Sequence, residues 1–105
     1  MLDDVAYAAG TLTETEPETR TRVAPRWKVI LHNDDVTTFV FVTELLVRLF
    51  HKSRSEALRL TNLVHQTGLA VVEITSRERA ELYVEQVRSL ARPRGFPLTA
   101  TIEPE

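Results

Sequence analysis

The sequence lacks cysteine entirely and holds only three glycines among its 105 residues. Without thiols there is no disulfide framework, no thiolate metal site and no cysteine nucleophile. The G-x-S-x-G element of many hydrolases is also missing, so the residues offer nothing for nucleophilic hydrolysis. No apolar run approaches the roughly 18 residues of a membrane span, and the acidic start, residues 1–4, does not resemble a secretion signal. We therefore expect a cytoplasmic domain without a membrane partner.

An excess of positive charge is missing as well. Lys and Arg number 13 against 15 Asp and Glu, which gives a formal net charge of -2. This balance argues against general polyanion binding, so we expect no nucleic-acid partner. The length fits one small domain, and the 43% apolar content is enough for a packed core.

Charge is unevenly distributed along the chain. Residues 1–24 hold five acids and two bases, and residues 11–21 form a Thr-Glu-Pro stretch with almost nothing to bury. Such a stretch cannot offset the entropy lost on ordering. We predict a flexible acidic tail over 1–24 and a folded core domain over 25–105.

Hydrophobic periodicity predicts six elements in the core domain. Alternating or continuous apolar residues indicate strands, and apolar residues spaced three and four apart indicate helices. The expected strands cover 27–31, 69–75 and 98–102, and the expected helices cover about 38–51, 54–67 and 77–91. The order β-α-α-β-α-β predicts an α+β fold: a two-layer sandwich with a three-stranded antiparallel sheet and three helices on one side.

Helix boundaries carry their own signals. Thr37 or Thr38 is suited to cap the first helix, and Ser53 with Glu56 forms a capping box before the second. Thr75 with Glu78 repeats that pattern before the third helix. The first two helices are joined by a very short link, so we expect an antiparallel hairpin that returns the end of the second helix to the start of the first.

This hairpin predicts a cluster of polar groups. It brings His65 towards the turn that contains Asn33, Asp34 and Asp35. The amide oxygen, the carboxylates and a neutral imidazole are all hydrogen-bond acceptors. A primary ammonium, such as a peptide α-amino group, brings three donors and one positive charge, so it would suit this cluster. The apolar residues expected to line an adjoining hollow are Phe39, Val42 and Leu98.

Two other interpretations remain open. His32, together with Asp34, Asp35 and His65, could hold a divalent metal, although no usual metal-ligand spacing supports it. Alternatively, the five arginines between 77 and 94 could make the domain a small nucleic-acid- or ribosome-associated binding module. Interleaved glutamates and the lack of an aromatic platform favour a solvated helix face with ion pairs instead.

Five segments of the core domain form a combined pattern: Trp27 to Thr37, Val64-His65, Gly68 to Ala70, Pro97-Leu98 and Thr101 to Glu103. In this order and spacing, from about Pro25 to Glu103, they resemble the ClpS family. Members of this family are adaptors that deliver N-end-rule substrates, or N-degrons, to the AAA+ unfoldase of the Clp protease. The resemblance implies the same α+β fold, an adaptor and not an enzyme, and no cofactor or metal.

The resemblance also implies roles for individual residues. Asn33, Asp35 and His65 would hold the substrate α-amino group, with Asp34 and Thr37 in support. Val42 and Leu98 match residues that line the family's hydrophobic pocket, which accepts N-terminal Leu, Phe, Tyr or Trp. Phe39 and Thr61 stand where the family usually has methionines, so we expect a different rank order among these four residues.

For the partner, the resemblance implies a docking face on the third helix. Glu78 matches an acidic residue of the unfoldase-binding face, and Tyr83 replaces a lysine often found there. The unfoldase would be of the ClpA or ClpC type, the adaptor would act as a monomer, and the acidic tail would engage the unfoldase during delivery.

Overall fold

Three strands and three α-helices follow one another in residues 24–105, the part of the chain that this computed structural model describes. Their bounds are β2 Arg26–His32, α2 Phe39–Arg48, α3 Arg54–Thr67, β3 Leu69–Ser76, α4 Arg77–Ala91 and β4 Thr99–Pro104, with a short 3₁₀ helix, η1 Arg92–Arg94, before β4. The predicted order β-α-α-β-α-β is confirmed. The predicted tail lies outside the described residues, apart from its last residue.

The sheet has the strand order β3-β2-β4, and β2 pairs antiparallel with both neighbours. His32, at the end of β2, lies opposite Leu69 at the start of β3 and opposite Thr99 at the start of β4. An antiparallel register therefore places the turn after β2 beside the segments that precede the other two strands. This is how three segments far apart in the sequence meet at one end of the sheet.

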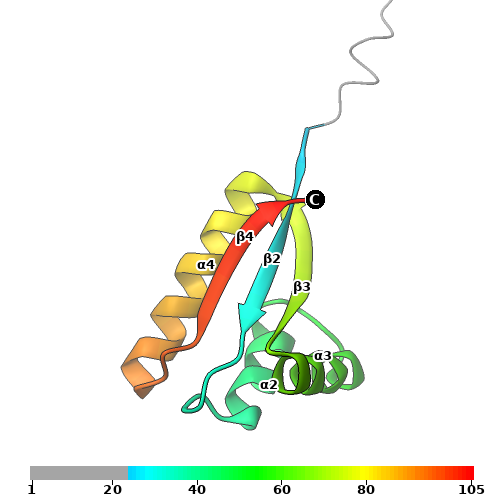
Figure 1. Ribbon diagram of the computed structural model, residues 1–105. Coiled ribbons are helices and arrows are strands. Elements are labelled where there is room, and N and C mark those ends of the chain that lie inside the picture. The colour runs from blue at the N-terminus through cyan, green and yellow to red at the C-terminus, as the bar shows by residue number, and fades with distance from the viewer. Residues whose placement is uncertain (1–23) are drawn as a thin grey trace, which may run out of the picture.

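The helices cover one face of the sheet. Val29 and Leu31 of β2 are fully buried in the core, whereas Leu69 and Val71 of β3 are exposed. Successive side chains of a strand point to opposite faces, so one face packs against helices and the other faces solvent. Figure 1 shows α4 lying along the sheet and α2 and α3 gathered near the end of β2. The predicted two-layer α+β architecture is confirmed.

Helix α2 ends earlier than predicted, at Arg48 and not near His51. Thr38 caps its start by accepting a hydrogen bond from the amide of Phe41. After the helix, His51 adopts a left-handed backbone with φ of 60°, and the amide of Lys52 donates to the carbonyl of Leu46 at 2.9 Å. Helix α3 begins only a few residues later, so the chain reverses its direction within this short link.

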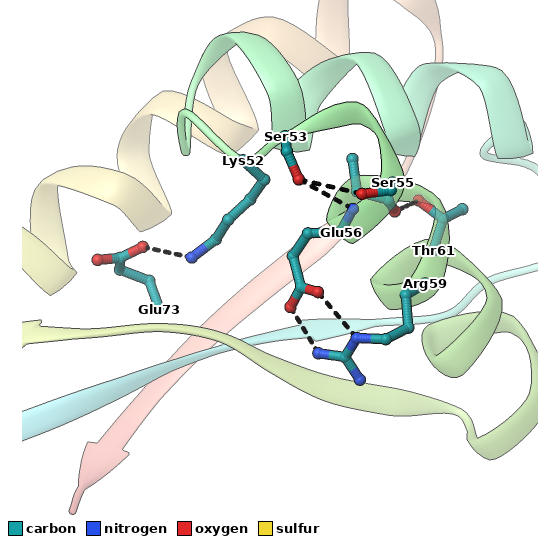
Figure 2. A network of polar contacts seen from close by, with 8 residues as sticks. Lys52, Ser53, Ser55, Glu56, Arg59, Thr61 and Glu73 are labelled. Atoms are coloured by element: carbon teal, nitrogen blue, oxygen red, sulfur yellow. Dashed lines mark hydrogen bonds and ion pairs between the residues drawn. The ribbon is translucent and has the colours of Figure 1, made fainter.

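Helix α3 begins as predicted, with Ser53 accepting a hydrogen bond from the amide of Glu56. Figure 2 shows this cap, together with the Glu56–Arg59 ion pair on the following turn. Lys52, just before the cap, forms an ion pair with Glu73 of β3 at 3.1 Å. The start of α3 is thereby fixed against the sheet.

Helix α4 is capped by Ser76 and not by the predicted Thr75. Thr75 is paired with Trp27 in the sheet, so the strand continues one residue further than the capping-box pattern indicated. The apolar spacing of α4 predicts Ala80, Val84, Val87 and Leu90 or Ala91 on its inward side. The buried residues are Ala80, Tyr83, Val87 and Ala91, so Tyr83 takes the place expected for Val84, which is only partly buried.

Candidate functional site

The turn after β2 is organised by the carboxylate of Asp34. Its Oδ1 accepts hydrogen bonds from the amides of Val36 and Thr37 at 2.8 and 2.7 Å, and its Oδ2 accepts one from the Thr37 hydroxyl at 2.7 Å. Partial burial pushes the pKa of Asp34 upward, but these bonds and the nearby Arg92 guanidinium outweigh it, so the pKa lies below its ordinary value. Asp34 is therefore a structural carboxylate of the turn.

The same turn is bonded to the end of α3. The amide of Asn33 donates to the carbonyl of Gly68 at 2.8 Å, and the amide of Gly68 donates to the carbonyl of Val64 at 2.9 Å. Gly68 ends α3 in the left-handed region, with φ of 95°, where glycine is the favoured residue. These two bonds hold the last turn of α3, which carries His65, beside Asn33.

A small hollow lies between the turn, α2 and α3. It measures about 20 Å³, and its lining residues are Asn33, Thr37, Thr38, Phe39, Val42, Thr61, Val64 and His65. The structure thus brings six of the predicted site residues to one place. A volume of this size holds about one water molecule, so the hollow is nearly closed.

The polar side chains at this hollow differ in how far they are already bonded. Within residues 24–105, the side chains of Asn33, Asp35 and His65 take part in no hydrogen bond or ion pair, and all three are exposed. Asp35 does not line the hollow itself but lies two residues along the chain from Asn33, which does. These three acceptors are available to a ligand, whereas the carboxylate of Asp34 is not.

Three residues that line the hollow are deeply buried. Val42, Thr61 and Val64 are all at least 95% buried, and only Phe39 among the large apolar lining residues is exposed, at 41%. A half-exposed side chain at the start of a helix can change rotamer without disturbing the core. Phe39 is therefore the wall that can move to enlarge the hollow.

Thr43 contributes to the site although the sequence analysis did not single it out. It is 4% exposed, and its hydroxyl lies 2.9 Å from the hydroxyl of Thr61. The signal available in the sequence was a threonine that directly follows Val42 on the buried side of α2.

Leu98 does not line this hollow. It is 1% exposed and belongs to a second small hollow formed with Val84 and Arg88 of α4. Because Leu98 precedes β4 on the helix-covered face, it packs against α4 and contributes to the core.

The two residues expected at the docking face are placed differently from each other. Glu78 is exposed in the first turn of α4. Tyr83 is 8% exposed, with its ring stacked on Phe50 at 4.5 Å between ring centroids, so it serves mainly the core. Only its hydroxyl, 3.5 Å from a nitrogen of Arg79, approaches the surface.

A larger hollow of about 830 Å³ lies elsewhere on α2, lined by other residues such as Val40 and Leu45. Its one acidic side chain, Glu44, is already paired with Arg54 at 2.8 Å and Arg48 at 3.4 Å. The negative charge in this hollow is therefore already balanced by two arginines, despite the hollow's size.

The metal and nucleic-acid interpretations gain no support from residues 24–105. They contain no group of three or more His, Asp or Glu side chains placed to hold a metal ion, and His32 instead bonds to Thr101 of β4 at 2.7 Å. On α4, Arg77 pairs with Glu81 and Arg88 pairs with Glu85, so the predicted ion-paired face is confirmed.

No helix in the described part of the chain has the length and apolar character needed to cross a bilayer.

Comparison with known proteins identifies the family. Residues 22–101 match the family model described as "ATP-dependent Clp protease adaptor protein ClpS". The chain is 45% identical to the ClpS adapter protein of Desulfatibacillum aliphaticivorans over 91 residues, which are 87% of this chain and 88% of that protein. It is 35% identical to the ClpS adapter protein of Myxococcus xanthus over 94 residues, 90% and 88% of the two chains.

A solved structure has the same fold. Agrobacterium tumefaciens ClpS2 bound to L-phenylalaninamide superposes with a TM-score of 0.76 and 37% identity, covering 79% of this chain and all of that chain. Both the resemblance noted in the sequence and the predicted fold are confirmed. The chain belongs to the ClpS family of adaptor proteins of the ATP-dependent Clp protease.

Proposed function

We propose that this adaptor binds the free α-amino terminus of a polypeptide whose first residue is large and hydrophobic, and delivers that polypeptide to a Clp unfoldase. The observation that carries the proposal is a set of acceptors whose side chains make no hydrogen bond or ion pair within residues 24–105: Asn33 and His65, which line one hollow, and Asp35, two residues along the chain from Asn33. An ammonium group has three donors, and this set offers one acceptor from each of three side chains.

The chemistry of the set fits a cation better than a neutral donor. Asp35 supplies a full negative charge, while the Asn33 amide and a neutral His65 imidazole orient the remaining donors. Hydrogen bonds to a charged group contribute about 1.5–3 kcal/mol each, and burial of a Leu or Phe side chain contributes a similar amount.

The first side chain of the substrate would enter the hollow after Phe39 moves. The present hollow of about 20 Å³ cannot hold a Leu or Phe side chain. The ligand of the Agrobacterium relative, L-phenylalaninamide, combines a free α-amino group, a large apolar side chain and an amide in place of the next peptide bond. It has the three features that this site is arranged to receive.

Delivery requires a second surface, which we place at the exposed start of α4 around Glu78. The partner would be a ClpA-type or ClpC-type unfoldase, and the adaptor would work as a cytoplasmic monomer without a catalytic step of its own. A Glu78→Arg variant should keep its peptide affinity but lose unfoldase binding, which binding assays with the purified partner would measure. Equal unfoldase binding by variant and parent would move the docking face elsewhere.

The substrate proposal is tested with twenty peptides that differ only in the first residue. Measured by fluorescence anisotropy at pH 7, peptides beginning with Leu, Phe, Tyr or Trp should bind at least tenfold more tightly than those beginning with Gly, Ser, Asp or Glu. A flat profile over all twenty peptides contradicts the proposal. Mixed RNA at physiological salt provides the comparison for the nucleic-acid alternative and should not compete.

A further inference from the structure

A buried pair of hydroxyl groups forms one wall of the hollow. Thr61 of α3 is 2% exposed and lines the hollow, and Thr43 of α2 is 4% exposed directly behind it. Their oxygens lie 2.9 Å apart. Burying a hydroxyl without a hydrogen bond costs free energy. The contact between the two hydroxyls therefore makes this wall of the hollow polar and hydrogen-bonded.

The two hydroxyls have fewer protons than hydrogen-bonding contacts. The Thr43 hydroxyl lies 3.0 Å from the carbonyl of Phe39, and the Thr61 hydroxyl lies 2.7 Å from the carbonyl of Ala57, a bond drawn in Figure 2. Together with the contact between the two hydroxyls, this makes three oxygen–oxygen contacts served by two protons. Each hydroxyl has one donor and two acceptor positions, so acceptor capacity is left over.

Of the two hydroxyl-bearing residues, only Thr61 lines the hollow. Thr43 lies behind Thr61 and fixes the position of its hydroxyl, and both carbonyls already accept an amide hydrogen bond as part of their helices. A donor that entered the hollow would therefore complete the network without leaving a backbone group unpaired.

We infer that the hydroxyl of Thr61, positioned by Thr43, selects substrates whose first residue carries a hydrogen-bond donor at the far end of its side chain, with tyrosine preferred over phenylalanine. This inference rests on the proposed function, since it concerns the side chain of the same bound terminus. Thr61 is the specificity-determining residue, and Thr43 is its positioning residue. The preference for tyrosine is modest because the two hydroxyls already form a hydrogen bond with each other when no ligand is present.

The test compares three peptides that begin with Tyr, Phe or 4-methylphenylalanine and are otherwise identical. The last of these matches tyrosine in size but has a methyl group in place of the donor. The full-length chain should bind the Tyr peptide about three- to tenfold more tightly than the 4-methylphenylalanine peptide. In Thr61→Val, this ratio should fall to one or below, while affinity for the Phe peptide changes less than twofold.

Two further variants separate hydrogen bonding from packing. Thr61→Ser keeps the hydroxyl and should retain the Tyr preference, and Thr43→Val should reduce it. Thr67→Val is the matched control, because Thr67 also bonds to a carbonyl four residues earlier on α3 but lies outside the hollow. It should leave the ratio unchanged.

The outcomes distinguish a failure of the proposed function from a failure of the inference about Thr61. If the parent chain binds none of the three peptides, the proposed function fails. If it binds all three but Thr61→Val gives the same Tyr to 4-methylphenylalanine ratio as the parent, the proposed function stands and the inference about Thr61 is overturned.

Discussion

The two hollows on α2 differ in size and in the state of their charged groups. The larger, of about 830 Å³, has its acid Glu44 paired with two arginines. The smaller, of about 20 Å³, is lined by Asn33 and His65, whose side chains make no hydrogen bond or ion pair within residues 24–105. The same holds for Asp35, two residues along the chain from Asn33. Volume alone would favour the larger hollow, but a ligand is recognised by groups that it can still bond. In the proposed function, unused acceptors and not space therefore mark the site.

The largest expected effect tests this difference in charge pairing. Asp35→Asn removes the negative charge at nearly constant size, so we expect peptides with a free α-amino terminus to bind about 10- to 100-fold more weakly. Glu44→Gln is the control in the larger hollow and should change affinity less than twofold. Isothermal titration calorimetry with a Leu-initiated peptide measures both, and equal losses in the two variants contradict the assignment.

A smaller effect is expected at the movable wall. Phe39→Ala removes the ring that closes the hollow, so peptides that begin with Ile or Val should bind about fivefold more tightly relative to Leu than they do in the parent. Val40→Ala is the matched control, since Val40 is the next residue of α2 but is 69% exposed and lines the larger hollow. If both variants shift the ratio equally, Phe39 has no special role at the hollow.

The smallest expected effect sharpens the contrast between two adjacent acids. Asp34 accepts three hydrogen bonds within the turn, so Asp34→Asn should lower the free energy of unfolding by about 1 kcal/mol at pH 7. Asp35→Asn should leave it nearly unchanged. Urea denaturation measures both.

The pH dependence of this effect follows from the lowered pKa of Asp34. A carboxyl whose pKa is lower in the folded state stabilises the fold fully above its unfolded pKa of about 3.9, and this contribution is lost as the pH falls through the folded value. The difference between the parent and Asp34→Asn should therefore be constant from pH 5 to 7 and shrink below pH 4. A difference that grows on acidification is incompatible with a lowered pKa.

Much of the fold was predictable because local signals agreed with one another. Apolar spacing located every strand and α-helix, Ser53 marked the start of α3, and the short link after α2 implied the hairpin that returns His65 to the turn. The predicted cap of α4 was wrong by one residue, because β3 continues through Ser76, which pairs with Arg26 and also accepts the capping hydrogen bond from the amide of Arg79.

The parts of the site that were not predictable depend on side-chain packing between elements. Tyr83 and Val84 both fit the three-or-four-residue spacing of the buried side of α4. Only the stacking of the Tyr83 ring on Phe50 shows that Tyr83 is the more deeply buried of the two. Likewise, the contact of Thr43 with Thr61 joins two helices, and no spacing within either helix indicates it. Contacts of this kind can be identified only once the packing of α2 against α3 is known.

The central claim is that the site recognises the charge and donors of a polypeptide's first amino group. The most direct measurement compares a Phe-initiated peptide that has a free α-amino group with the same peptide acetylated at that group, at pH 7. Acetylation removes the charge and two of the three donors, so we expect affinity to fall at least 100-fold. Equal affinity for the two peptides would contradict the claim, whatever the preference for the first side chain.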